Sequence, residues 1–157
     1  MSKLVIKNGF VIDTLQHLNG IQDVNILDGY IAENSPCDID AVVIDATDCY
    51  VFPGLIDFHT HLYDGSAFGI NPDLLLACGV TTAIDAGSAG WINFENFLSK
   101  TILQKMIRLR AFVNVSGVGM PGAGINEPLD MCSINWNKLE SLFEKYRDCL
   151  LYTSDAA

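Results

Sequence analysis

The change of pattern at Pro53-Gly54 constrains the fold of this 157-residue chain more than any other feature. Before it, short apolar runs alternate with turn dipeptides such as Asn8-Gly9 and Asp28-Gly29, which are the strongest local hairpin signal. We therefore expect residues 1–52 to form part of a small β-sandwich. The expected strands are 4–7, 10–13, 23–27, 30–33 and 41–46, and the expected loops are 14–20 and 34–40.

After this point the apolar residues alternate between strand and helix spacing. Repeated strand–helix units predict an α/β fold, with a parallel sheet covered by helices as an open doubly wound sheet or a closed barrel. The expected strands are 55–62, 80–86 and 110–116, and the expected helices are 72–78, 93–106 and 139–146.

Two histidines, His59 and His61, are separated by a single residue and lie at the end of the first of these strands. Alternate residues of a strand point to the same side, so Asp57 shares their face. Two imidazoles there can reach one cation, since neutral nitrogen suits zinc, and Asp57 is expected to hold a ligand imidazole. The opposite face, expected to pack against helices, carries Ile56, Phe58, Thr60 and Leu62.

Residues 51–62 resemble the first barrel strand of the amidohydrolase superfamily, in its dihydroorotase-like branch. Residues 79–90 resemble the second strand of that branch. Within them, residues 85–90 followed by Asn93-Phe94 are similar to a group of amidohydrolase/deacetylase metallohydrolases. The hairpins before Pro53 resemble the composite N-terminal sandwich of the same family.

The resemblance implies a (β/α)8 TIM barrel that holds one or two divalent metals, usually zinc, with His59 and His61 as the first metal ligands. A whole barrel takes about 250 residues, so residues 53–148 would supply only the first three β/α units of an incomplete barrel. The remaining ligands, a lysine, two histidines and an aspartate that acts as general base, would lie on later strands. The implied chemistry is metal-assisted hydrolysis.

Departures from the dihydroorotase pattern bear on the substrate. Tyr63 stands where dihydroorotases carry an arginine for the substrate carboxylate, and Gly87-Ser88 stands near their asparagine. We therefore expect a small-molecule amide of the N-acyl or deacetylase type. The alternatives are a cyclic amidohydrolase of the dihydroorotase or deaminase type, and a non-catalytic scaffold that keeps the barrel.

Three further polar residues are candidates for the site: each could hold a metal-binding side chain in place or contact the substrate. Asp85 could face the site or cap the turn after its strand, and Ser88 could touch substrate or serve the turn. Asn114 could line the pocket or satisfy the backbone. The glycine-rich residues 117–124 lack the lysine of a phosphate loop, so they predict a mobile loop at the barrel mouth.

Composition excludes several classes of partner. A net charge of −10 argues against nucleic acid and anionic membrane surfaces. No run approaches the roughly 20 apolar residues of a membrane span. Five cysteines without C-x-x-C spacing indicate reduced thiols in a cytoplasmic protein. The charge, the apolar runs and the cysteine spacing are all compatible with a homo-oligomer of the full-length protein.

Residues 149–157 break the preceding pattern and resemble the translation of a transposon-end adapter used in preparing sequencing libraries. We therefore expect a non-native tail; the alternative is a genuine frayed C-terminus. Three strands of an eight-stranded barrel would leave an unpaired apolar edge. By itself such a chain is expected to aggregate and to lack activity.

Overall fold

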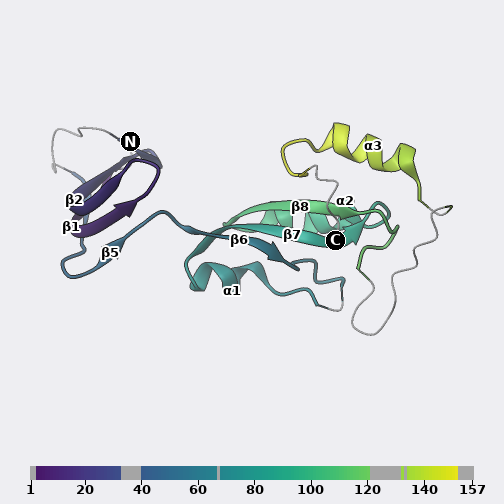
Figure 1. The fold of residues 1–157 in the computed structure, drawn as a ribbon, viewed down its shortest axis with the longest axis horizontal. Coiled ribbons are helices and arrows are strands. Elements are labelled where there is room, and N and C mark those ends of the chain that lie inside the picture. Colours follow the sequence, from purple (N-terminus) through teal and green to yellow (C-terminus); the bar gives the residue numbers. More distant parts are fainter. Residues whose placement is uncertain (1–2, 33–39, 67, 121–131, 133, 152–157) are drawn as a thin grey trace. The chain divides into compact units, whose positions relative to one another are not determined.

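The computed structural model describes residues 3–32, 40–66, 68–120, 132 and 134–151 (Figure 1). The chain divides into two compact units, Met1–Pro53 and Gly54–Ala157. The expected loop at 34–40, the second half of the glycine-rich segment and residues 152–157 therefore lie largely or wholly outside the described residues.

The N-terminal unit is a mixed sheet in which the long strand β1 is central. Strand order is β3-β2-β1-β4, and β5 also pairs with β1. The β1–β2 and β2–β3 pairs are antiparallel, whereas β4 and β5 run parallel to β1. The strands are β1 (Lys3–Asp13), β2 (Leu18–Leu27), β3 (Tyr30–Ile31), β4 (Val42–Asp45) and β5 (Tyr50–Val51).

The hairpin expected at Asn8-Gly9 is wrong, because β1 continues through it. The register against β2 shifts between Ile6 and Gly9, and Asn8 takes a left-handed φ of 61°. The Asn8 N–H donates to Asp23 Oδ1 at 3.0 Å, and its side-chain Nδ2 donates to Asp45 Oδ1 at 3.2 Å. Partners on both neighbouring strands thus hold a β-bulge where the local signal indicates a turn.

The turn expected at Asp28-Gly29 is confirmed. Both residues have positive φ, 49° and 84°, as a two-residue type I′ hairpin requires. The turn between β1 and β2 is instead closed by Asp13, whose Oδ1 accepts the backbone N–H groups of Leu15 and Gln16.

The C-terminal unit alternates strands and helices as predicted. Its described sheet has the order β6-β7-β8, and both pairs are parallel. This confirms an α/β fold for the second half of the chain. The elements are β6 (Leu55–Thr60), α1 (Pro72–Ala77), β7 (Val80–Gly90), α2 (Phe94–Lys100), the 3-10 turn η1 (Ile102–Gln104), β8 (Arg108–Asn114) and α3 (Trp136–Lys145).

Two boundaries of this unit differ from the prediction by four residues or more, and the other boundaries differ by three residues or fewer. Strand β7 extends four residues beyond the expected end, to Gly90. The helix expected to reach Met106 ends at Lys100, and the chain continues as η1. The tighter turn keeps Ile102 in the core but leaves Met106 91% exposed, so the helical stripe breaks there.

The core of this unit is built on α2. Phe94 and Phe97 are fully buried, and they belong to one cluster with buried apolar residues of β7, of β8, of α3 and of the segment that follows β6. Their rings pack edge to face with centroids 6.3 Å apart.

The outer face of β6 is not covered as expected. Thr60 and Leu62 are buried, but Ile56 and Phe58 are 63% and 68% exposed. In the described sheet β6 is an edge strand that pairs only with β7, and the described helices make few contacts with it.

Residues 149–151, the start of the expected adapter tail, lie beside β8. Ala111 forms a parallel bridge with Leu150. The Ala111 N–H donates to the Cys149 carbonyl at 3.0 Å, and the Leu151 N–H donates to the Ala111 carbonyl at 2.9 Å.

No helix among the described residues has the length and apolar character to cross a bilayer.

Candidate metal centre

His59 and His61 meet at the carboxyl end of β6. His59 belongs to the strand, and His61 follows its last residue, Thr60. Their ring centroids are 5.6 Å apart and the ring planes are nearly perpendicular, at 88°. His59 is exposed and His61 is half-buried. The structure therefore brings the two predicted ligands to one side of the chain, at the end of a parallel strand where barrel enzymes carry their catalytic groups.

Asp85 lies on β7 directly opposite Thr60 and is fully buried. Its Oδ2 accepts the backbone N–H of Leu62 at 2.7 Å, and its Oδ1 accepts the N–H of Ser88 at 2.8 Å. Burial raises the pKa of the Asp85 carboxyl, while these hydrogen bonds oppose the rise. Asp85 therefore caps its own turn and also fixes the chain just after His61.

Ser88 is fully buried between Asp85 and His61. Its Oγ lies 3.1 Å from Nδ1 of His61, and its side chain helps to lower the pKa of the Asp85 carboxyl against the larger effect of burial. Gly87, with φ of 82°, supplies the left-handed residue that the bend before Ser88 needs. Sequence reasoning treated Ser88 as a substrate or turn residue; the structure places it against the histidine.

The two remaining candidates make hydrogen bonds with backbone groups. Asp57 is half-buried, and its Oδ1 accepts the backbone N–H of His59 at 3.1 Å. Asn114 lies opposite Gly90 at the end of β8, and its Oδ1 accepts the backbone N–H of Ser116 at 2.8 Å. Asp57 thus helps to hold the end of β6 at the histidine pair, and Asn114 helps to hold the end of β8.

Tyr63, which stands where the dihydroorotase pattern has a cation, turns into the core. It is 5% exposed, and its ring lies 5.2 Å from that of Phe97. Its hydroxyl accepts a hydrogen bond from Asn96 Nδ2 at 2.8 Å. The sequence signal for the packing of Tyr63 on α2 is the apolar stripe of that helix, because such a stripe offers a surface that an aromatic ring can cover.

The histidine pair fits a metal centre as part of its ligand set. Two imidazoles that bind one tetrahedral zinc at about 2.0–2.1 Å have ring centres roughly 5 Å apart, close to the observed 5.6 Å. The described residues contain no group of three or more histidine, cysteine or carboxylate side chains that could hold an ion. A zinc centre needs three or four protein ligands, so a complete one requires residues beyond those described.

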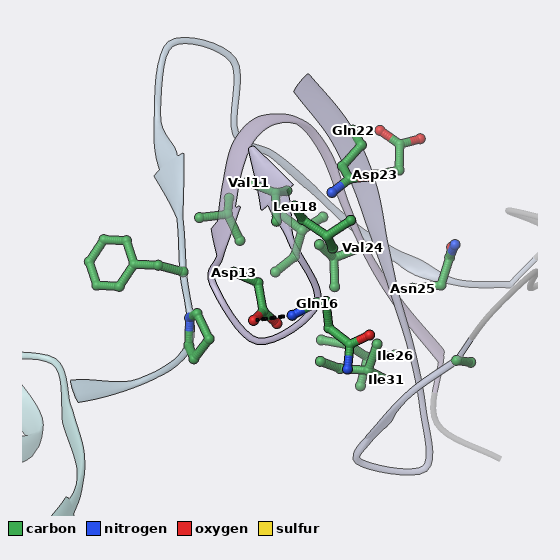
Figure 2. A pocket seen from close by; sticks show the side chains of 15 residues that line it. Val11, Asp13, Gln16, Leu18, Gln22, Asp23, Val24, Asn25, Ile26 and Ile31 are labelled. Carbon is green, nitrogen blue, oxygen red and sulfur yellow. Dashed lines mark hydrogen bonds between the residues drawn. The ribbon is translucent and has the colours of Figure 1, made fainter. Parts of the chain in front are cut away.

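A hollow lies in the N-terminal unit (Figure 2). It has a volume of about 860 Å³ and is lined largely by apolar side chains of β1 and β2, such as Val11, Val24 and Ile26. Its polar Asp13 is engaged by the N–H of Gln16 at 3.1 Å. Its described lining holds neither histidine nor cysteine, so the hollow offers no counterpart to the histidine pair.

Comparison with known proteins finds relatives that are named deacetylases and dihydroorotases. The chain is 37% identical over 89 residues to a deacetylase of Brucella anthropi, a match that covers 55% of this chain and 22% of the relative. It is 34% identical over 107 residues to a deacetylase of Agrobacterium fabrum, covering 67% and 26%. A dihydroorotase of Clostridium acetobutylicum is 45% identical over 65 residues, covering 39% and 15%.

Solved structures agree on the fold. A dihydroorotase superposes with a TM-score of 0.78 at 24% identity, covering 96% of this chain and 41% of its own. An adenine deaminase superposes with a TM-score of 0.75 at 25% identity, covering 96% and 40%. No family model matches the chain.

The matches span only 22% and 26% of the two deacetylases. Within that span, the identity to named deacetylases and dihydroorotases agrees with the superposition on a dihydroorotase and an adenine deaminase. In sequence and in fold, the chain is therefore similar to proteins of the amidohydrolase superfamily.

Proposed function

We propose that this chain supplies the first part of a metal-dependent hydrolase that cleaves a non-peptide carbon–nitrogen bond of a small-molecule amide. The observation that carries the proposal is the pairing of His59 and His61, with ring centroids 5.6 Å apart at the carboxyl end of β6. In this proposal the two imidazoles hold a divalent metal, for which zinc matches the nitrogen donors.

In the same proposal, residues 53–148 are the first three β/α units of a (β/α)8 barrel. Support comes from the sequential parallel order β6-β7-β8 and from the exposed apolar side chains Ile56 and Phe58 on the edge strand β6. An edge of this kind is a liability that closure of a barrel removes. A further β/α unit beside β6 would pair with its free edge through the strand and cover these side chains through the helix.

The metal would supply Lewis-acid chemistry, lowering the pKa of water and polarising the scissile carbonyl. The contribution of this chain is to orient the ligands. Asp85 holds the backbone after His61, and Asp57 holds the backbone of His59. The general base that moves the proton is assigned to a residue outside those described.

An N-acyl substrate is favoured over a cyclic one. The two relatives named first are deacetylases, although dihydroorotases follow them. Tyr63 offers no cation to a substrate carboxylate, because its ring is buried against Phe97 and its hydroxyl is bonded to Asn96. A deacetylase-type reaction is therefore our choice of substrate class.

The test is metal content and hydrolysis in the longest open reading frame that contains these residues. The zinc-loaded protein is assayed against N-acetyl amino acids, dihydroorotate and hydantoins. His59→Asn and His61→Asn are expected to lose bound zinc and turnover. His17→Asn, which changes an exposed histidine of the N-terminal unit, is the matched control and should keep both.

Hydrolysis confined to the cyclic amides would replace the deacetylase assignment by a cyclic amidohydrolase. A protein that binds no zinc and hydrolyses none of these substrates would be the non-catalytic scaffold instead.

A further inference from the structure

Three side chains form a connected chain behind the histidine pair. Nδ1 of His61 lies 3.1 Å from Oγ of Ser88. The Ser88 side chain in turn favours the ionised form of the Asp85 carboxyl, whose pKa burial raises, as a hydroxyl that donates to a carboxylate does. Ser88 and Asp85 are both 0% exposed. Water therefore does not compete for these hydrogen bonds, and their direction follows from the protons available.

The proton count fixes that direction. An ionised carboxylate only accepts hydrogen bonds, and a serine hydroxyl has one proton to donate. The two Asp85 oxygens already accept backbone N–H groups from Leu62 and Ser88, an arrangement that suits the ionised form. The Ser88 hydroxyl therefore donates to Asp85, and its oxygen is left to accept from His61.

We propose that Ser88, anchored by Asp85, is a positioning residue that holds His61 as the tautomer protonated on Nδ1, with Nε2 free to bind the metal. A metal-binding histidine usually donates its other ring nitrogen to a fixed acceptor, which sets the tautomer and the ring orientation. The value of this tautomer for metal binding rests on the proposed function. The tautomer itself is a property of the metal-free protein.

Ser88→Ala tests the proposal, because it removes the hydroxyl and keeps the backbone N–H that Asp85 accepts. The matched control is Ser66→Ala. Ser66 is another serine of the same unit, and its buried Oγ has no hydrogen-bond partner in the described part of the chain. Two quantities are measured in the longest open reading frame: the His61 tautomer of the metal-free protein by ¹⁵N NMR, and Zn²⁺ affinity by competition with a chelator.

The wild-type protein is expected to carry the His61 proton on Nδ1. In Ser88→Ala the two tautomers should mix, and Zn²⁺ should bind about 10- to 100-fold more weakly, the usual effect of losing such a partner. Ser66→Ala should match the wild type in both measurements. Ser88→Cys, with nearly the same volume and a weak sulfur donor and acceptor, should shift the tautomer similarly if Ser88→Ala fails to fold.

A wild-type His61 protonated on Nε2 would overturn the proposal. So would a tautomer, or a Zn²⁺ affinity, that is unchanged when the Ser88 hydroxyl is removed. A wild-type protein that binds no Zn²⁺ would refute the proposed function instead, and the tautomer of the metal-free protein would still decide whether Ser88 positions His61.

Discussion

The Asp85 carboxylate accepts the backbone N–H of Leu62 at 2.7 Å, and this bond ties β7 to the residue that follows His61. Its other oxygen accepts the N–H of Ser88, so one fully buried side chain fixes both the end of the histidine strand and the bend of β7. Buried backbone N–H groups need acceptors. The geometry around His61 therefore depends on Asp85, which lies 24 positions further along the chain. The oxygens of Asp85 accept backbone N–H groups, so its role is to hold the backbone and not to bind a metal.

Replacing Asp85 with alanine should destabilise the C-terminal unit. Two buried N–H groups lose their acceptor, at about 1–3 kcal/mol each, so we expect a loss of about 2–6 kcal/mol in the free energy of unfolding. Chemical denaturation followed by circular dichroism measures it. Asp64→Ala, at an exposed position, should stay within about 0.5 kcal/mol of the wild type. Equal effects of the two changes would argue against the role of Asp85.

Truncation of Phe97 tests the core built on α2. Phe97 is fully buried and contacts the rings of Tyr63 and Phe94. Phe97→Ala should cost about 3–5 kcal/mol, because it removes apolar contacts and leaves a cavity. Met106→Ala, at a residue 91% exposed, is the control and should change the unfolding midpoint little. If the two variants unfold at the same denaturant concentration, the core is misassigned.

Gly90 marks a close approach of two backbone segments. A Cβ at this position would overlap the carbonyl oxygen of Ser116, which is backbone and cannot swing away. Gly90→Ala should therefore destabilise the protein by about 1–3 kcal/mol. A Cβ at Gly20 meets nothing within 4 Å, so Gly20→Ala should be neutral. The comparison is made by thermal unfolding, and a neutral Gly90→Ala would contradict the observed packing.

Periodicity and turn signals predicted the strand–helix order of the C-terminal unit, and local chemistry predicted the Asp28-Gly29 hairpin. They failed at Asn8, where side-chain partners on β2 and β4 convert a turn signal into a bulge. Those partners lie 15 and 37 residues away along the chain. A short window of sequence does not contain them.

The same reasoning explains what could be predicted of the site. Alternation along a strand places His59 and His61, which are separated by one residue, on the same side, and the centroid distance of 5.6 Å agrees with this. The contact between His61 and Ser88 joins residues 27 positions apart and depends on the β6–β7 register, which contains two irregularities. Alternation within one strand carries no information on that register.

The contact between α2 and α3 gives a prediction on pH. Glu95 Oε1 accepts Lys145 Nζ and the Tyr146 hydroxyl, each at 2.8 Å. The hydrogen bond from Lys145, followed by that from Tyr146, lowers the pKa of Glu95 below its ordinary value. The folded pKa is thus lower than the unfolded one. The contact contributes its full stabilisation above the ordinary glutamate pKa and loses it as the pH falls through the lowered pKa.

Lys145→Met removes the main cause of this shift, so the Glu95 carboxyl should titrate at higher pH than in the wild type. NMR titration of the Glu95 side-chain carboxyl measures it directly. Because both side chains are about 60% exposed, added salt should also raise the wild-type midpoint by screening the pair. Lys100→Met changes a lysine at the end of α2 that takes no part in the contact, and it should leave the midpoint in place. An identical Glu95 midpoint in Lys145→Met and wild type would show that the ion pair does not hold the two helices together in solution.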